Sequence, residues 1–179
     1  MGLLNKISWF LRYSILGYPL MDAPDDMIDE LRTAQTLLDL GCGRGNLLGR
    51  LRRIGWTGSY CGVDISERAI SDAKILYEND LHSFFLIGDL DGNRRLECSA
   101  RSWHAIVLVE SIYYLSPHKA MTLVHSLLDR LRPGGKLIIR VHDPVKHELH
   151  ITALLRLGNV VRRVSPQVFV IANRFELSN

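Results

Sequence analysis

Glycines and carboxylates follow the first three apolar runs of the chain. A Gly-X-Gly-X-Gly loop at 41–45 follows the first run, Asp64 follows the second, and Asp89 follows the third. Because glycine lacks a Cβ, such a loop lets a ligand approach the backbone amides at the start of a helix. A carboxylate about 20 residues after the glycines is placed to accept both hydroxyls of a ribose, and Asp89 could accept from an adenine amino group. The pattern predicts a cofactor of adenosine type.

A parallel sheet would bring these residues together. From Thr36 onward, short apolar runs alternate with amphipathic segments, which is typical of βαβ units and predicts a doubly wound α/β fold. The predicted elements are strands 36–40, 59–63, 83–87, 105–109 and 136–141, helices 45–54 and 145–157, helices capped by Ser66 and Ser116, and an antiparallel hairpin of 160–164 and 168–172. Because ligands bind at the carboxyl ends of such strands, the glycines and carboxylates should share one edge. Asp39, inside the first strand, either braces the glycine loop or reaches a cofactor amine through water.

The order of the motifs resembles that of a known enzyme family. Leu37–Gly45 reads LLDLGCGRG and resembles motif I of the class I S-adenosylmethionine-dependent methyltransferases. Three further segments resemble the family's ribose-binding strand end, its adenine-contacting motif and the turn into its fifth strand: Gly62–Ser66, Ile87–Leu90 and Leu131–Leu137. The resemblance covers about residues 36–173.

The resemblance implies a fold, a cofactor and a set of site residues. The fold would be a Rossmann-like, mostly parallel seven-stranded sheet of order 3-2-1-4-5-7-6, with helices on both faces and strand seven antiparallel. The cofactor would be S-adenosylmethionine, with S-adenosylhomocysteine as product. The cofactor-binding residues would be Asp39, Gly41, Cys42, Gly43, Asp64, Ile65, Asp89, Leu90 and Glu110. His104 departs from the family, which often has aspartate there, but that position is usually structural.

Methyl transfer needs an acceptor that is positioned and, in some cases, deprotonated. We predict that the acceptor site lies past the fourth and fifth strands, and that His142, Tyr113 and Glu110 are catalytic. For His142, a general base is one interpretation, and a histidine hydrogen-bonded locally at a strand end is the other. The other candidates for this site are Tyr114, His118 and Asp143, with Trp9, Tyr13 and Tyr18 from the N-terminal segment.

Several residues after the fifth strand are of the types that bind metal ions. His142, Asp143, His147, Glu148 and His150 are close in sequence, and the cluster is similar to that of small-RNA 2′-O-methyltransferases, which use a metal beside the cofactor. However, no spacing among them is diagnostic of a metal site. A solvated helix face explains them better, and we predict no metal.

Composition sets the limits of the interpretation. Apolar residues make up 47% of the chain and charged residues 23%, and the net charge of +3 does not by itself indicate nucleic-acid binding. Three cysteines without a CxxC pair argue against a disulfide framework and suit a cytoplasmic protein. No run is long enough to span a bilayer. We predict one structural domain, with residues 1–35 as a helical cap over the active site of a methyltransferase domain at 36–179.

The sequence favours a small-molecule acceptor methylated on nitrogen or oxygen, because no lid domain or binding module is evident. Three alternatives remain open at this point: an RNA or protein methyltransferase, a non-catalytic cofactor-binding subunit, and a nicotinamide dehydrogenase, which also uses glycines and an acid after strand two. Asp89 and the terminal hairpin argue against the dehydrogenase. A homodimer is also left open.

Overall fold

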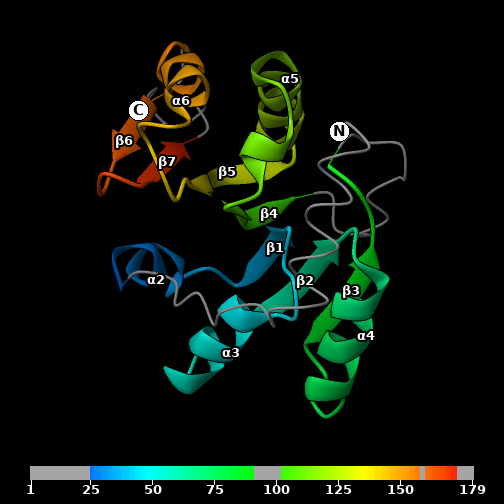
Figure 1. The fold of residues 1–179 in the computed structure, drawn as a ribbon. Helices are drawn as coiled ribbons and strands as arrows, with labels where there is room; N and C mark the ends of the chain where they lie inside the picture. Colours follow the sequence, from blue (N-terminus) through cyan, green and yellow to red (C-terminus); the bar gives the residue numbers. More distant parts are fainter. Residues whose placement is uncertain (1–24, 91–101, 158–159, 173–179) are drawn as a thin grey trace.

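Seven strands form one mixed sheet at the centre of the computed structural model, which describes residues 25–90, 102–157 and 160–172 (Figure 1). The strands are β1 Thr36–Leu40, β2 Ser59–Asp64, β3 Ser83–Ile87, β4 Trp103–Val109, β5 Leu131–Arg140, β6 Val160–Arg163 and β7 Val168–Ala172. Their order is β3-β2-β1-β4-β5-β7-β6, and only the β5–β7 and β6–β7 pairs are antiparallel. The predicted fold class and strand order are therefore confirmed.

Helices cover both faces of the sheet (Figure 1). The helices are α2 Asp25–Leu31, α3 Asn46–Arg53, α4 Glu67–Leu76, α5 Pro117–Leu128 and α6 Glu148–Leu155, with a 3₁₀ turn, η1, at Ile112–Tyr114. Neighbouring residues of the central strands alternate between two hydrophobic clusters, because successive side chains of a strand point to opposite faces. Leu38 and Leu40 of β1 join the cluster beneath α5 and α6, whereas Leu37 joins the cluster beneath α2, α3 and α4.

Helix boundaries follow the predicted caps where a side chain closes the first turn. The Ser66 hydroxyl accepts from the Ala69 amide at 3.2 Å at the start of α4. The Ser116 hydroxyl accepts from the Lys119 amide at 3.4 Å at the start of α5. These contacts satisfy amides that have no partner within the helix.

Three local predictions differ from the structure. Helix α6 begins at Glu148 rather than 145, because the Asp143 carboxylate accepts from the Lys146 amide and holds a separate turn. Strand β5 begins at Leu131 rather than 136, because Leu131 already pairs with Trp103 before a bulge interrupts the ladder. The apolar periodicity of the helix that Ser66 caps predicts that Leu76 is buried, but Leu76 is 59% exposed.

The predicted N-terminal cap lies largely outside the described residues. Its last part, α2, packs on the sheet, where Glu30 accepts from Lys136 at 2.9 Å near the amino end of the regular part of β5. Cys61 on β2 is disulfide-bonded, so the sparse cysteine set is not evidence for a reducing compartment. Among the described residues, no helix is both long and apolar enough to cross a bilayer.

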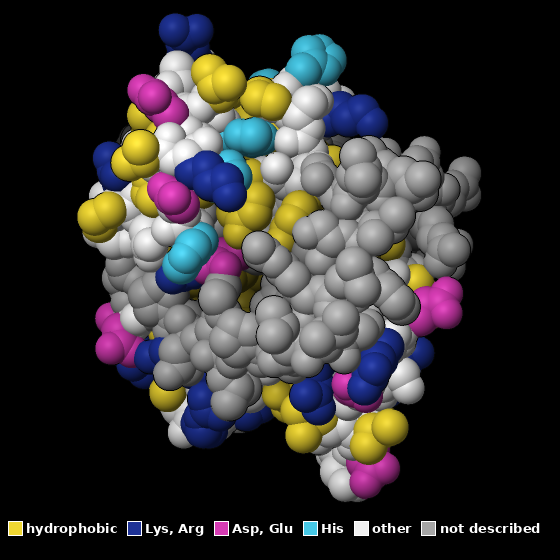
Figure 2. Space-filling view, in the orientation of Figure 1, with side chains coloured by type: hydrophobic (Ala, Val, Ile, Leu, Met, Phe, Trp, Pro, Cys, Tyr) yellow, Lys and Arg dark blue, Asp and Glu magenta, His cyan; other side chains and the backbone are white. Residues whose placement is uncertain are grey.

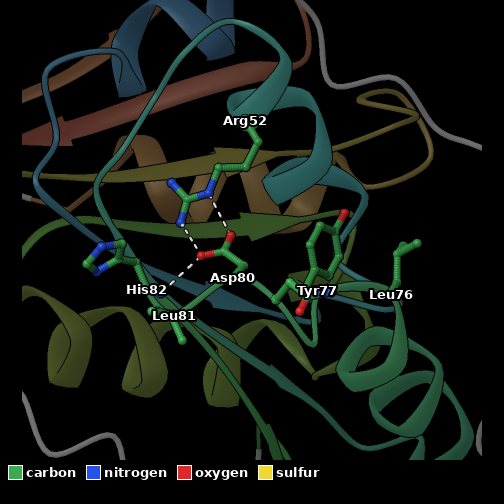
Figure 3. Close-up of a pocket in the computed structure, with 7 residues that line it drawn as sticks. Arg52, Leu76, Tyr77, Asp80, Leu81 and His82 are labelled. Carbon is green, nitrogen blue, oxygen red and sulfur yellow. Dashed lines mark hydrogen bonds and ion pairs between the residues drawn. The ribbon is translucent and has the colours of Figure 1, made fainter.

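A shallow pocket lies at the amino end of β3 (Figure 3). Its centre is occupied by Arg52 of α3, whose guanidinium donates to both carboxylate oxygens of Asp80 at 2.7 and 3.2 Å. The same guanidinium donates to the Trp56 and Gly58 carbonyls, so its hydrogen bonds join α3 to the loops that precede β2 and β3. Ligands of parallel sheets bind at the carboxyl ends of the strands. This pocket lies at the amino end and its residues connect structural elements, so it is not the expected ligand site.

Candidate functional site

The glycine loop turns sharply at the carboxyl end of β1. Gly41, Gly43 and Gly45 have φ values of 88°, 54° and 81°, a backbone region that other residues rarely adopt. The Gly41 amide donates to the Val63 carbonyl at 2.8 Å, which ties the loop to β2. A Cβ on Gly41 would lie 2.7 Å from the Ser111 Cβ, whereas a Cβ on Gly43 would meet no described atom within 4 Å. The backbone at Gly43 is therefore open to an approaching ligand.

Asp64 stands beside this open backbone at the carboxyl end of β2. Its carboxylate accepts from the Gly43 amide at 2.8 Å and from the Ser66 amide at 2.9 Å, one to each oxygen. Burial raises the pKa of Asp64, while the amides that donate to it lower that pKa. A carboxylate has about four acceptor positions, so two remain for a ligand that presents a pair of hydroxyls.

Asp89 and Leu90 lie at the same edge of the sheet as Asp64. Strand β3 runs parallel to β2 with Ile87 opposite Asp64, and the Gly88 amide donates to the Asp64 carbonyl at 2.9 Å. Ile65 follows Asp64 and is 37% exposed, so its apolar side chain is available to a flat ligand. The two carboxylates and the glycine loop thus share one edge, as the sequence predicted.

Asp39 lies below the loop on β1 with only 2% of its surface exposed. Its Oδ2 accepts from the Tyr60 hydroxyl at 2.6 Å, and its Oδ1 has no hydrogen-bond partner in the structure. Burial is the main reason that the pKa of Asp39 rises to about 7, and the nearby Asp64 carboxylate adds to the rise. The Tyr60 hydroxyl donates a hydrogen bond to Asp39 and lowers that pKa, so it opposes the rise.

Aromatic side chains support the loop from below, a feature that our sequence analysis missed. Phe85 packs against Tyr60 and Tyr77, each with ring centroids 5.6 Å apart. The Tyr77 hydroxyl donates to the Gly45 carbonyl at 2.8 Å. A Cβ on Gly62 would come within 2.9 Å of Phe85 and Tyr60, so glycine is needed there too. The signal was weak, because these aromatics are far apart in sequence and also suit a plain core.

Glu110 and His142 lie past the ends of β4 and β5. Glu110 is the single non-glycine residue with positive φ, 55°, in the described part of the chain. Its Oε1 forms a buried ion pair with the Arg140 guanidinium and lies 3.7 Å from His142 Nδ1. Gln167 accepts from Arg140 at 3.1 Å and donates to the His142 carbonyl at 2.6 Å. Sequence analysis missed Arg140 and Gln167, although a single cation at the end of an apolar run is a signal for a buried partner.

Tyr113 packs against the histidines of the segment that follows β5. Its ring stacks on His147 with centroids 4.1 Å apart and an angle of 5° between the planes. His150 is buried and its Nε2 donates to the Leu115 carbonyl at 2.9 Å. Histidine side chains gather over the part of the surface that α5 and α6 form (Figure 2). In the described ranges, no three histidine, cysteine, aspartate or glutamate side chains are grouped so that they could hold a metal ion.

The remaining acceptor candidates are placed in different ways. Tyr114 contacts Tyr113, with ring centroids 5.2 Å apart. Asp143 and His118 are exposed, and the Asp143 carboxylate caps the turn before α6. Trp9, Tyr13 and Tyr18 lie outside the described residues.

The donor set of this edge suits a nucleoside that carries cationic groups. Backbone amides and open space lie beside Gly43, paired acceptor oxygens stand at Asp64, and an unpartnered buried oxygen belongs to Asp39. Three carboxylates therefore lie at this edge of the sheet: Asp39, Asp64 and Asp89. Such a site attracts a positively charged ligand even though the whole chain is basic.

Comparison with protein families gives one match. The family described as "Methyltransferase domain" matches residues 12–163, which is most of the chain. No curated protein matches the chain in a sequence comparison.

Comparison with solved structures gives the same fold at low sequence identity. The PH0226 protein of Pyrococcus horikoshii is 17% identical with a TM-score of 0.63, over 95% of this chain and 98% of that one. The plantazolicin methyltransferase BpumL, solved with S-adenosylhomocysteine, is 16% identical with a TM-score of 0.64, over 95% and 90%. CalS10, an amino pentose methyltransferase from Micromonospora echinaspora solved with S-adenosylmethionine, is 20% identical with a TM-score of 0.53, over 79% and 57%.

Substitution of Gly41 by alanine should destabilise the fold more than the same change at Gly55. Both glycines have positive φ, but only a Cβ on Gly41 would meet Ser111. We expect Gly55→Ala to lower the free energy of unfolding by about 1–2 kcal/mol and Gly41→Ala by about 3 kcal/mol or more, measured by urea denaturation. Adding Ser111→Gly to Gly41→Ala should recover part of the loss. Equal losses at the two glycines would contradict the close packing at Gly41.

Asp39 should make the stability of the fold depend on pH. Below about pH 4 both the folded and the unfolded chain carry this proton, whereas between about pH 4 and 7 only the folded chain retains it. The free energy of unfolding should therefore fall as pH rises through this range, by about 4 kcal/mol at most, and level off above it. Urea denaturation of the wild type and Asp39→Asn from pH 4.5 to 8 checks this. A stability difference between the two proteins that is constant with pH would show that Asp39 is not the group responsible.

Proposed function

Because this chain belongs to the methyltransferase domain family, as an S-adenosylmethionine-dependent enzyme of the class I Rossmann-like fold, we propose that it methylates a nitrogen or oxygen atom of a small-molecule acceptor. The observation that carries the proposed cofactor site is the hydrogen bond from the Gly43 amide to Asp64. It joins the open glycine backbone to a carboxylate with two acceptor positions left. The proposal for a small acceptor is supported by two structural neighbours, the plantazolicin methyltransferase BpumL and the amino pentose methyltransferase CalS10.

In this proposal, different residues at the carboxyl edge of the sheet bind different parts of the cofactor. Asp64 accepts the ribose hydroxyls, Ile65 packs on the adenine, and Asp89 and Leu90 lie at the adenine edge. The residues Asp39, Gly41, Cys42 and Gly43 lie beside the methionine part, and Glu110 follows from β4. The cofactor supplies a methyl group on a positively charged sulfur, which is already a good leaving group. The protein therefore needs to orient the acceptor, exclude water and remove a proton.

His142, Glu110 and Tyr113 are the proposed catalytic residues. His142 is 65% exposed and its Nδ1 faces the Glu110 carboxylate, so its Nε2 is directed away from that carboxylate. In this arrangement Glu110 orients the imidazole, and His142 accepts the acceptor's proton at Nε2. Arg140 holds the Glu110 carboxylate in place through their buried ion pair. Tyr113, stacked on His147, forms an aromatic wall beside them.

Replacement of Asp64 tests the cofactor site. Asp64→Asn removes the charge and one side of the paired acceptor, so we expect S-adenosylmethionine and S-adenosylhomocysteine to bind about 10- to 100-fold more weakly in calorimetry. Asp29→Asn is the control, since Asp29 is an exposed carboxylate of α2 that pairs with Arg32 of its own segment. Far-ultraviolet circular dichroism confirms that both variants are folded. Unchanged affinity in a folded Asp64→Asn protein would refute the assignment.

Replacement of His142 tests the proposed base. A panel of amines, phenols, carboxylic acids and RNA oligonucleotides, assayed with radiolabelled cofactor, first identifies the acceptor class. His142→Asn should then lower the transfer rate by about 10²- to 10⁴-fold while cofactor affinity stays within twofold. His82→Asn, at the opposite edge of the sheet, is the control and should transfer at the wild-type rate. Transfer by His142→Asn at the wild-type rate would exclude a base role, and methylation of RNA alone would overturn the small-acceptor proposal.

A further inference from the structure

Asp39 differs from Asp64 and Glu110 in having one buried carboxylate oxygen with neither a hydrogen bond nor an ion pair among the described residues. It lies two residues before Gly41 and is 2% exposed. One of its oxygens accepts from Tyr60, while the other, Oδ1, is buried and has no hydrogen-bond partner. An ionised carboxylate with a free buried oxygen is costly, because neither water nor a donor compensates the lost hydration.

Among the described residues, the groups that face Asp39 do not supply a positive charge. They are Tyr60 and Asp64 on β2 and Cys42 in the glycine loop, and none of them carries a positive charge. Tyr77, which follows α4, interacts with Tyr60. Burial and the negative charge of Asp64 both favour the protonated form of Asp39. Only the Tyr60 hydroxyl favours the ionised form. A cation that binds beside the loop would lower the pKa of Asp39 and favour the ionised carboxylate.

The substrate and the product of methyl transfer differ by one positive charge. The sulfonium of S-adenosylmethionine becomes a neutral thioether in S-adenosylhomocysteine, while the ammonium and carboxylate are common to both. A site that gains free energy from a positive charge therefore discriminates between them, and burial strengthens the effect because the local dielectric is low.

We propose that the Asp39 carboxyl carries its proton in the protein alone and releases it to solvent when the cationic cofactor binds beside the glycine loop, so that it selects S-adenosylmethionine over its product. The O–H bond of the carboxyl breaks, the proton passes to the buffer, and the remaining carboxylate charge stabilises the sulfonium. This inference rests on the cofactor site proposed above. It gives Asp39 a role in specificity and in release of the product.

The proposal fixes the direction of the pH dependence. Because ligand binding requires Asp39 to lose its proton, the affinity for S-adenosylmethionine should increase as pH rises towards 7 and become constant above it. The affinity for S-adenosylhomocysteine should change less. The ratio of the two affinities should therefore grow with pH and then level off.

Calorimetry in two buffers of different ionisation enthalpy counts the released protons. For wild-type protein we expect S-adenosylmethionine to release about nine tenths of a proton at pH 6, about half at pH 7 and almost none at pH 8.5. S-adenosylhomocysteine should release clearly less at pH 6 and 7. Equal release by the two ligands would overturn the role in selection, and no release by either would overturn the whole inference.

Two variants assign the proton to Asp39. Asp39→Asn should abolish the release and flatten the affinity ratio across the pH range, whereas persistent release would assign the proton to Asp64 and overturn the inference. Tyr60→Phe, which keeps the ring and removes the hydroxyl, should move the pH range of release upwards, and it serves alone if Asp39→Asn does not fold. Asp29→Asn, at an exposed carboxylate of α2, is the control and should match the wild type. If neither ligand binds wild-type protein, the cofactor site itself is refuted, which differs from binding without proton release.

Discussion

The hydrogen bond between the Gly43 amide and Asp64 holds the candidate site together. It crosses from the loop after β1 to the end of β2, so it fixes the distance between two strands at the edge where a ligand would enter. The bond forms only because glycine permits the positive φ of the loop, and because Asp64 is buried enough to prefer an amide to water. The aromatic rings beneath the loop and Ser111 beside it then leave the turn little room for another conformation. The loop is thereby preorganised before any ligand arrives.

The same edge keeps acidic groups inside the protein, and the structure compensates them unequally. Glu110 has a buried cation, Arg140, as its partner, and its positive φ is a local strain that the surrounding contacts must offset. Asp64 has amides. Asp39 has one hydroxyl and a free oxygen. The buried carboxylate with the fewest compensating contacts is therefore Asp39, beneath the glycine loop. A cationic ligand would stabilise a negative charge most at this position. A protein that is basic overall can thus gather carboxylates at one edge of its sheet.

The sequence predicted the sheet because its signals were local. Each of the first five predicted strands is an apolar run followed by glycine or by a charged or polar residue. Serine caps mark the starts of α4 and α5. The type and order of these elements could therefore be derived without knowledge of tertiary contacts. The start of β5 could not be predicted, because the run at 132–135 looks like a turn and forms a bulge only through the pairing of Leu131 with Trp103. Arg140 and Gln167 were missed for the same reason. Their partners are set by the packing of strands that are distant in sequence.

The hydrogen bonds of Gln167 join the turn between β6 and β7 to Arg140 and to the backbone of His142, where we propose that the acceptor binds. The loop, Asp64 and Asp89 all come from residues 36–90, whereas the backbone of His142 is held by a turn that follows β6. During synthesis on the ribosome, the residues of the proposed cofactor site therefore emerge before the turn that holds His142. A nascent chain that has emerged only as far as α6 would contain the proposed cofactor-binding residues but not the turn that positions the proposed base, His142.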